Sequence, residues 1–123
     1  MIFNDPKPIY IQIADAIMDK IVSGEYAAES RLPSVRDYAA SVEVNANTVM
    51  RSYDYLQQEG IIYNKRGIGY FTAPDGRQNV LAMRKAKFFD NEVFYFFGRL
   101  KSFDVAPDEL SRMYTDFLEN IKK

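Results

Sequence analysis

The chain has 123 residues, of which 47% are hydrophobic and 27% charged, and its formal net charge is −1. These values are typical of one globular domain, or of a small domain with an appendage, and they exclude a disordered chain. The sequence has no cysteine and no histidine, so it can form no disulfide and no thiolate metal site, and it lacks the commonest general base and metal ligand. We expect no metal, no cofactor and no enzyme. No apolar run reaches the roughly 18 residues of a membrane span, and the first residues lack the features of a signal peptide, so we expect a cytoplasmic protein.

Two helices are predicted in the first third of the chain. The first begins at Pro8, which suits the first turn of a helix, and ends near Gly24. Between these two residues, apolar side chains recur at spacings of three and four. The second helix begins after Ser34, a favourable N-cap, and stops near Ser41.

A third helix is predicted between Asn45, which caps its N-terminus, and Gly60, which closes it. One face of this helix is apolar and is expected to pack on the core: Ala46, Val49, Tyr53 and Leu56. The opposite face is polar and carries a single formal charge: Asn47, Thr48, Arg51 and Tyr55. Asparagine, threonine and arginine side chains read base edges or bind phosphates, so we expect this face to contact nucleic acid.

Two short β-strands are predicted at residues 61–63 and 70–72, with a glycine-bearing loop between them, and Leu32 is a candidate for a third short strand. The sequence Ala73-Pro74-Asp75-Gly76 then predicts a boundary between a domain of residues 1–75 and a helical segment of residues 76–123. In that segment one long helix covers residues 78–101 and another begins at Pro107.

The order of helix, short helix, tight turn, helix and β-hairpin is that of a winged helix-turn-helix, whose third helix enters the major groove of DNA. Arg36 on the second helix and Lys65 and Arg66 on the hairpin are then expected to face the same duplex as the third helix. Each has a less specific interpretation. Arg36 could pair with a neighbouring carboxylate, and Lys65 and Arg66 could be an ordinary charged hairpin tip.

The bulk charge of the predicted DNA-binding half does not favour this function. Residues 1–75 carry seven basic and ten acidic side chains, whereas residues 76–123 carry nine and seven. DNA-binding domains are usually basic. The placement of the cations must therefore account for any affinity for DNA.

The segment from Pro8 to Phe71 resembles the DNA-binding domain of the GntR family of bacterial transcription regulators. The matching segments occur in order and at family spacing over about half of the chain: Pro8-Ile9-Tyr10-Ile11-Gln12-Ile13, Ser23-Gly24-Glu25-Tyr26, Arg31-Leu32-Pro33-Ser34-Val35-Arg36, Val44-Asn45-Ala46-Asn47-Thr48-Val49, Glu59-Gly60-Ile61-Ile62 and Arg66-Gly67-Ile68-Gly69-Tyr70-Phe71.

This resemblance implies DNA contacts at one set of residues: Arg36, Asn45, Asn47, Thr48, Arg66 and Gly67. Together with Arg51 and Lys65 they form the predicted DNA-binding site. Many relatives have arginine where this chain has Ala46, which removes one base contact. Only 48 residues follow Asp75, and none is histidine, so the chain resembles the short YtrA subfamily, whose tail of two helices serves dimerisation.

The helix of residues 78–101 carries aromatic side chains on more than one side, and one neighbouring helix cannot bury them all. Two helices within 48 residues cannot form an independent core, so we assign these side chains to a homodimer interface. The predicted interface residues are Phe88, Phe89, Val93, Phe96, Phe97 and Leu100. A small-molecule pocket lined by the aromatic residues is the alternative, and the sequence names no effector for it.

The sequence thus predicts a mostly α fold with a small β-wing, namely an N-terminal winged helix-turn-helix followed by a two-helix C-terminal dimerisation segment. The predicted function is that of a transcription regulator, a repressor by preference, that binds a two-fold-related operator in double-stranded DNA as a homodimer. A protein-interaction module is the first alternative, but interface cores are usually apolar, unlike the polar face of the third helix. An enzyme is the second, and it would lack a phosphate-binding loop and a metal cluster.

Overall fold

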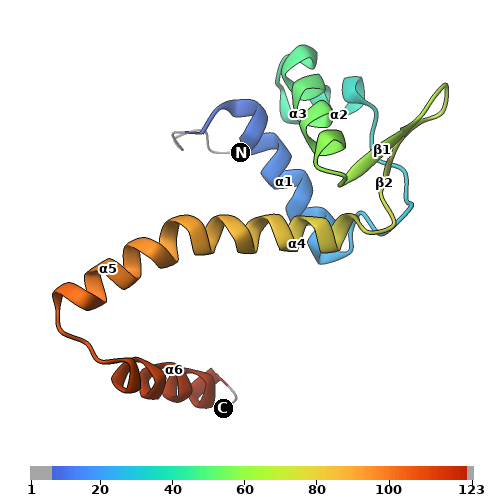
Figure 1. Ribbon diagram of the computed structural model, residues 1–123. Helices are drawn as coiled ribbons and strands as arrows, with labels where there is room; N and C mark the ends of the chain where they lie inside the picture. Colours follow the sequence, from blue (N-terminus) through green and yellow to red (C-terminus); the bar gives the residue numbers. More distant parts are fainter. Residues whose placement is uncertain (1–6, 122–123) are drawn as a thin grey trace. The chain divides into compact units, whose positions relative to one another are not determined.

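The computed structural model describes residues 7–121, which divide into two compact units. The N-terminal unit extends to Met83, and the C-terminal unit begins at Arg84. The elements of the N-terminal unit are α1 (Ile9–Ser23), α2 (Val35–Val42), α3 (Ala46–Gln58), β1 (Ile62–Lys65), β2 (Gly69–Thr72) and the first part of α4 (Gly76–Lys87) (Figure 1). The predicted fold, mostly helical with a small β-wing, is confirmed. No described helix is long and apolar enough to cross a membrane.

The ends of the first helices follow the predicted signals. Pro8 is the N-cap of α1, and Gly24 ends this helix with a left-handed φ of 91°, which glycine adopts without strain. The hydroxyl of Ser34 accepts a hydrogen bond of 3.1 Å from the backbone N–H of Asp37 and so caps α2. At the other end of α2, Glu43 adopts a left-handed φ of 56°, which turns the chain toward α3.

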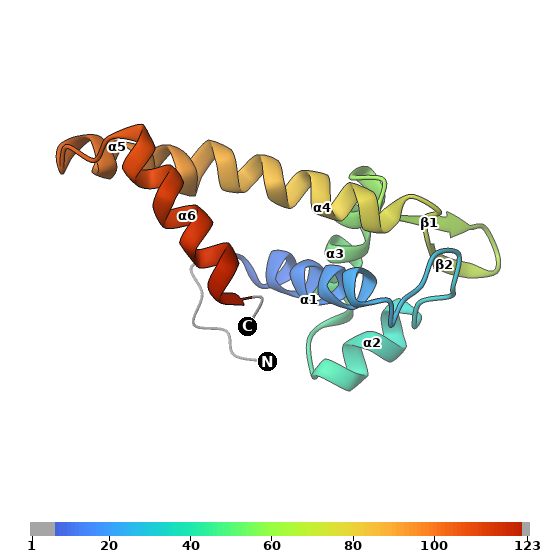
Figure 2. The ribbon, with the colours of Figure 1, turned by 90° about the horizontal axis from the view of Figure 1, so that it is seen from below.

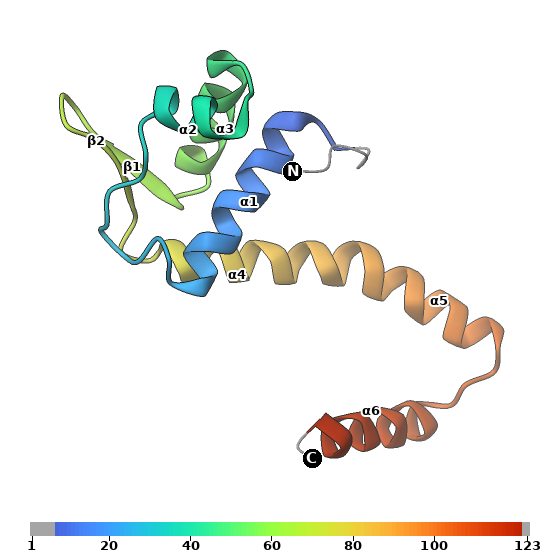
Figure 3. The ribbon, with the colours of Figure 1, turned by 180° about the vertical axis from the view of Figure 1, so that it is seen from behind.

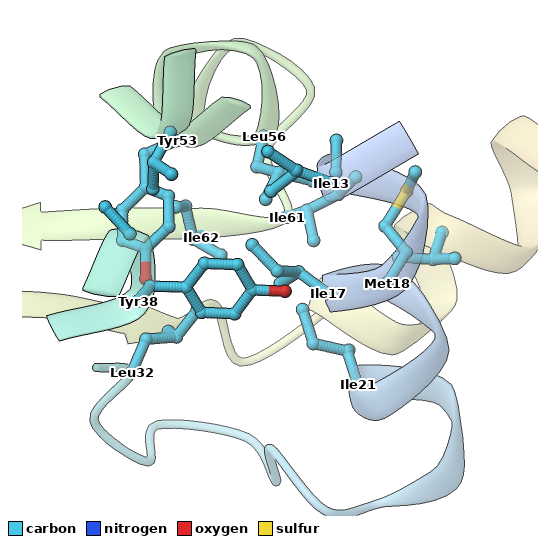
Figure 4. Close-up of a cluster of buried hydrophobic side chains, with 14 residues drawn as sticks. Ile13, Ile17, Met18, Ile21, Leu32, Tyr38, Tyr53, Leu56, Ile61 and Ile62 are labelled. Carbon is cyan, nitrogen blue, oxygen red and sulfur yellow. The ribbon is translucent and has the colours of Figure 1, made fainter. Parts of the chain in front are cut away.

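Helix α3 packs against both α1 and α2, and the three helices enclose a shared core (Figures 1 and 2). The core is formed by large apolar residues of all three helices, of β1 and of the segments just before α2 and β1 (Figure 4): Ile13, Ile17, Met18, Ile21, Leu32, Tyr38, Tyr53, Leu56, Ile61 and Ile62. Val49 of α3 is also buried. The prediction for Ala46 was wrong, because this residue opens α3 at the surface and is exposed.

The hairpin is an antiparallel pair in which Ile62 faces Thr72 and Lys65 faces Gly69. The expected third strand is reduced to an isolated bridge between Arg31 and Phe71, beside which the N–H of Leu32 donates to the carbonyl of Tyr70 at 2.9 Å. Within the N-terminal unit the hairpin extends beyond the helices, with its turn at the free end (Figure 3).

The first turns of α4 belong to the N-terminal unit. Val80 is fully buried, and the side-chain amide of Asn79 donates to the carbonyl of Gly60 at 2.9 Å. A Cβ atom at Gly76 would lie 2.6 Å from the carbonyl oxygen of Ile61, so only glycine fits where this helix begins. The compact unit therefore continues past the predicted boundary at Asp75.

The C-terminal unit consists of the end of α4, a π-helical segment η1 (Phe88–Val93), α5 (Phe94–Ser102) and α6 (Pro107–Ile121). The predicted helix of residues 78–101 is thus helical throughout, with a π-helical segment inside it, and the last helix begins at Pro107 as expected. Val93 is the only buried residue among residues 84–121. This unit has no hydrophobic core of its own.

Truncation of Leu56 to alanine tests the orientation of α3. Its side chain is completely buried, so Leu56→Ala should lower the free energy of unfolding by about 2–5 kcal/mol through the lost apolar contacts and the cavity that remains. Chemical denaturation measures this change. Gln57→Ala, next to it but exposed, is the control and should unfold at nearly the same denaturant concentration as the parent. Equal stability of Leu56→Ala and the parent would mean that α3 presents another face to the core.

Candidate nucleic-acid interface

A groove of about 460 Å³ lies between the start of α2, the first turns of α3 and the hairpin. The groove is lined by Arg31 before α2, Arg36 of α2, Asn47 and Met50 of α3, and Gly69 of β2. Residues 31–36, the first turns of α3 and the hairpin therefore meet at one concave surface. The first two of these segments present Arg31, Arg36 and Asn47 to it. We refer to this surface as the groove.

Arg36 is the second residue of α2 and is exposed at the groove. It forms no ion pair with any described residue, so the alternative interpretation, a pair with a neighbouring carboxylate, is not observed. Its guanidinium group is therefore available to an anion.

Two hydrogen bonds fix α3 against its neighbours. The hydroxyl of Ser52 donates to the carbonyl of Tyr10 on α1 at 2.7 Å, and the hydroxyl of Tyr53 donates to the carbonyl of Pro33 at 2.6 Å. Burial raises the pKa of Tyr53 far above its ordinary value, so its hydroxyl stays protonated and remains a donor even in alkaline solution. The sequence pattern did not identify Ser52 as a buried contact.

The N-terminus of α3 places its two asparagines differently. The side-chain oxygen of Asn45 accepts a hydrogen bond of 2.7 Å from the backbone N–H of Asn47, so this oxygen is used by the cap. The side chain of Asn47 is exposed and lines the groove. Thr48 is half-buried and does not line it. Of these three predicted contacts, Asn47 has the most direct access to the groove.

Arg51 is exposed, and its guanidinium carbon lies 4.1 Å from the ring centroid of Tyr10. This stacking holds the cation at the surface of α3 and restricts its side-chain rotamers. Tyr55, predicted on the same polar face, is instead half-buried, and its hydroxyl lies 3.6 Å from the sulfur of Met83. The exposed face of α3 also includes Met50, which the sequence analysis did not consider.

The hairpin turn presents the predicted wing residues Lys65, Arg66 and Gly67, all of which are exposed. The ammonium group of Lys65 lies 4.9 Å from the ring centroid of Phe71, within the range of a cation–π contact. Gly67 has a φ of 79°, a conformation that the turn requires and that glycine adopts without strain.

Arg31 is a groove residue that the sequence analysis did not assign to the site. Its guanidinium group donates to the carbonyl of Ile68 at 2.6 Å and so connects the segment before α2 to the wing. A Cβ atom at Gly69 would lie 3.0 Å from the Nε atom of Arg31, so glycine at this position leaves room for the arginine. The only signal in the sequence was its place in the segment Arg31-Leu32-Pro33, which precedes α2.

Residues 9–71 match the family model described as bacterial regulatory proteins, gntR family. This is the segment that holds every element around the groove. The chain belongs to the GntR family. Its N-terminal unit is the winged helix-turn-helix of a DNA-binding transcription regulator, and the relatives named below are regulators rather than enzymes.

The similarity to members of the GntR family extends over most of the chain. The transcriptional regulator YhcF of Bacillus subtilis is 32% identical over 117 residues, which are 95% of each chain. The repressor YtrA of the same organism is 34% identical over 84 residues, covering 66% of this chain and 65% of that protein. A crystal structure of a GntR-family regulator from Bacteroides thetaiotaomicron is 47% identical, with a TM-score of 0.82, and the match covers 92% of this chain and 98% of that one.

Removal of the Arg31 side chain tests its role as a connection to the wing. Arg31→Ala should weaken DNA binding roughly tenfold, since a hydrogen bond from a charged group contributes on the order of 1.5 kcal/mol and the wing loses its attachment. Backbone amides at residues 66–69 should also exchange faster with solvent. Arg77→Ala is the matched control, because Arg77 is another exposed arginine that donates to a backbone carbonyl, that of Val22 at 3.0 Å, away from the groove. If both variants bound DNA equally well, Arg31 would have no part in the interface.

Proposed function

We propose that this regulator is a repressor that binds a two-fold-related operator as a homodimer, with α3 in the major groove of each half-site and the wing beside it. The observation that carries this proposal is the groove, where Arg31 and Arg36, from the segment that leads into α2, and Asn47 of α3 face one surface. The related repressor YtrA of Bacillus subtilis supports the direction of regulation.

The proposed roles of the site residues follow from their places. Asn47, at the start of α3, reads a base edge, since asparagine forms paired hydrogen bonds with adenine. Asn45 and Thr48 flank it and contact the backbone or the adjacent base. Arg36 and Arg51 bind phosphates on either side. Wing residues Lys65, Arg66 and Gly67 contact the backbone next to the half-site.

Selection of bound duplexes from random DNA tests the proposal as a whole. A dimer of this fold should enrich two inverted half-sites whose centres are about one helical turn apart or a multiple of it. Enrichment of a single, unrepeated site would contradict the homodimer, and enrichment of no sequence would contradict a specific operator.

Two alanine variants should separate specificity from general affinity. Asn47→Ala should reduce the free energy of binding to the selected operator by about 1–3 kcal/mol and should relax the base preference at one base pair. Arg36→Ala should weaken binding to all DNA sequences alike, because one phosphate contact is lost. It should also reduce the slope of the logarithm of the binding constant against the logarithm of the salt concentration by about one. Binding measured over a salt series, on cognate and scrambled duplexes, shows both effects.

Gln58→Ala is the control for these variants, since Gln58 is exposed at the far end of α3. It should bind both duplexes like the parent. The assignment of base reading to α3 fails if Asn47→Ala keeps both the affinity and the base preference of the parent.

The proposed dimer interface is the apolar surface of the C-terminal unit. Phe88, Phe89, Phe96 and Phe97 are each about half exposed, and Leu100 is half-buried. Val93 is only 9% exposed and therefore adds little free surface. Further apolar side chains of α6 are also exposed: Met113, Tyr114, Phe117 and Ile121. No residue of α5 or α6 is fully buried, so both helices present apolar side chains that their own unit covers only in part.

A second copy of the chain accounts for the size and composition of this surface. A stable interface removes about 800 Å² from each partner. An aromatic side chain has roughly 150–250 Å² of surface, so the four half-exposed phenylalanines supply about 400 Å², and the exposed apolar side chains of α6 can supply the rest. Exposed apolar patches of this extent are rare on monomers and promote aggregation.

A single charge in the apolar surface should disrupt the proposed dimer. Phe96→Asp places a carboxylate at a phenylalanine that is 47% exposed, and the desolvation of this charge should shift the protein toward monomer or aggregate. Operator affinity should then fall by a factor on the order of 10²–10⁴, because the two half-sites are no longer bound by linked units. Sedimentation velocity and binding assays measure the two effects.

Asn91→Asp is the matched control, since it adds the same carboxylate at an exposed polar residue of η1. It should remain dimeric with the affinity of the parent. A parent protein that sediments as a monomer at micromolar concentration would rule out the dimer.

A further inference from the structure

Exposed apolar side chains occupy the part of the groove where base contacts are proposed. Met50 is 37% exposed, and Ala46 is exposed one turn before it on α3. Both line the groove together with Asn47. Positions 46 and 50 are four residues apart, so their side chains lie one above the other on the same face of the helix. They form an apolar strip directly beside the amide of Asn47.

The packing of the N-terminal unit does not account for this strip. The core contacts of α3 are made by Val49, Tyr53 and Leu56, and Met50 belongs neither to the buried cluster nor to the residues packed against it. Complete burial of a large apolar side chain stabilises a protein by about 1.5–3 kcal/mol, and an exposed side chain does not contribute this free energy. The exposed part of Met50 is therefore available to contact another molecule at the groove.

The cations at the groove identify the class of that molecule. Arg36 and Arg31 line the same concave surface as the apolar strip. The molecule that binds there should therefore carry negative charge and also present an apolar group to the strip. In the major groove of DNA, the 5-methyl group of thymine is the apolar group that base edges present between the two phosphate backbones. Alanine is small enough to pack against this methyl group, and methionine can contact it through its flexible, polarisable thioether.

We propose that Ala46 and Met50 read the 5-methyl groups of thymine, next to an adenine read by Asn47, so that the half-site contains A·T pairs at the positions facing the first turns of α3. This inference rests on the proposed function and adds the chemistry of its specificity. Hydrogen bonding by Asn47 distinguishes adenine, and the adjoining apolar strip distinguishes thymine from cytosine, which lacks the methyl group.

Replacement of single thymines by deoxyuridine in the selected operator tests the proposal. Uracil keeps the hydrogen-bonding edge of thymine and lacks only the methyl group. At one or two positions of each half-site the parent protein should bind the uracil duplex roughly fourfold more weakly, the loss expected for one buried methyl group. Met50→Gln, similar in length but polar, should bind thymine and uracil duplexes alike at one of these positions, whereas Met50→Leu should keep the preference for thymine.

Two controls make the result specific. Gln57→Ala, exposed at the far end of α3, should keep the full preference for thymine. Circular dichroism should show that the Met50 variants keep their helices, which is expected because Met50 is exposed. The inference is overturned if the parent binds thymine and uracil duplexes equally at every position, or if Met50→Gln retains the whole preference. These outcomes leave the proposed function intact, whereas failure of the parent to select any operator would overturn both.

Discussion

The side chain of Tyr53 is the constraint on which the geometry of the groove depends. Its ring is buried in the core and lies 5.0 Å from the ring of Tyr70 on β2 and 6.4 Å from that of Tyr38 on α2, measured between centroids. Its hydroxyl donates to the carbonyl of Pro33, immediately before the cap of α2. One residue of α3 thus contacts the two other elements that border the groove. Because interiors are close-packed, a shift of this ring would displace all three together.

The capacity of this domain to bind DNA depends on where its charged side chains lie rather than on its net charge. Acidic side chains outnumber basic ones in residues 1–75, yet five of the seven cations, namely Arg31, Arg36, Arg51, Lys65 and Arg66, lie on the groove, on α3 or on the wing. Of the other two, Lys7 forms an ion pair of 3.1 Å with Asp15 on α1. Salt screens charges over about 8–10 Å, so a bound phosphate responds mainly to the cations nearest to it. A net negative domain can therefore bind DNA at one face.

Local sequence signals made the helices and strands predictable, whereas the set of residues that line the groove could not be predicted from the sequence. The caps at Ser34 and Asn45 and the closing glycine at Gly60 lie within a few residues of the ends that they mark, so spacing alone located the helices. Ala46 was misplaced because an apolar residue in the first turn fits the periodic stripe whether or not it is covered. Arg31 was missed because its partner, Ile68, is 37 residues away and only the folded chain brings them together.

The proposed dimer also determines how the C-terminal unit folds. Helix α6 has 15 residues and buries none of them, and an isolated helix of this length is marginally stable in water. In the proposed dimer, its stability would come from apolar contacts that a second copy supplies. Folding of this unit and association of two chains then become one equilibrium, which depends on protein concentration. In the proposed dimer, operator binding through two linked half-site contacts would inherit that dependence, so operator occupancy would respond steeply to the abundance of the protein.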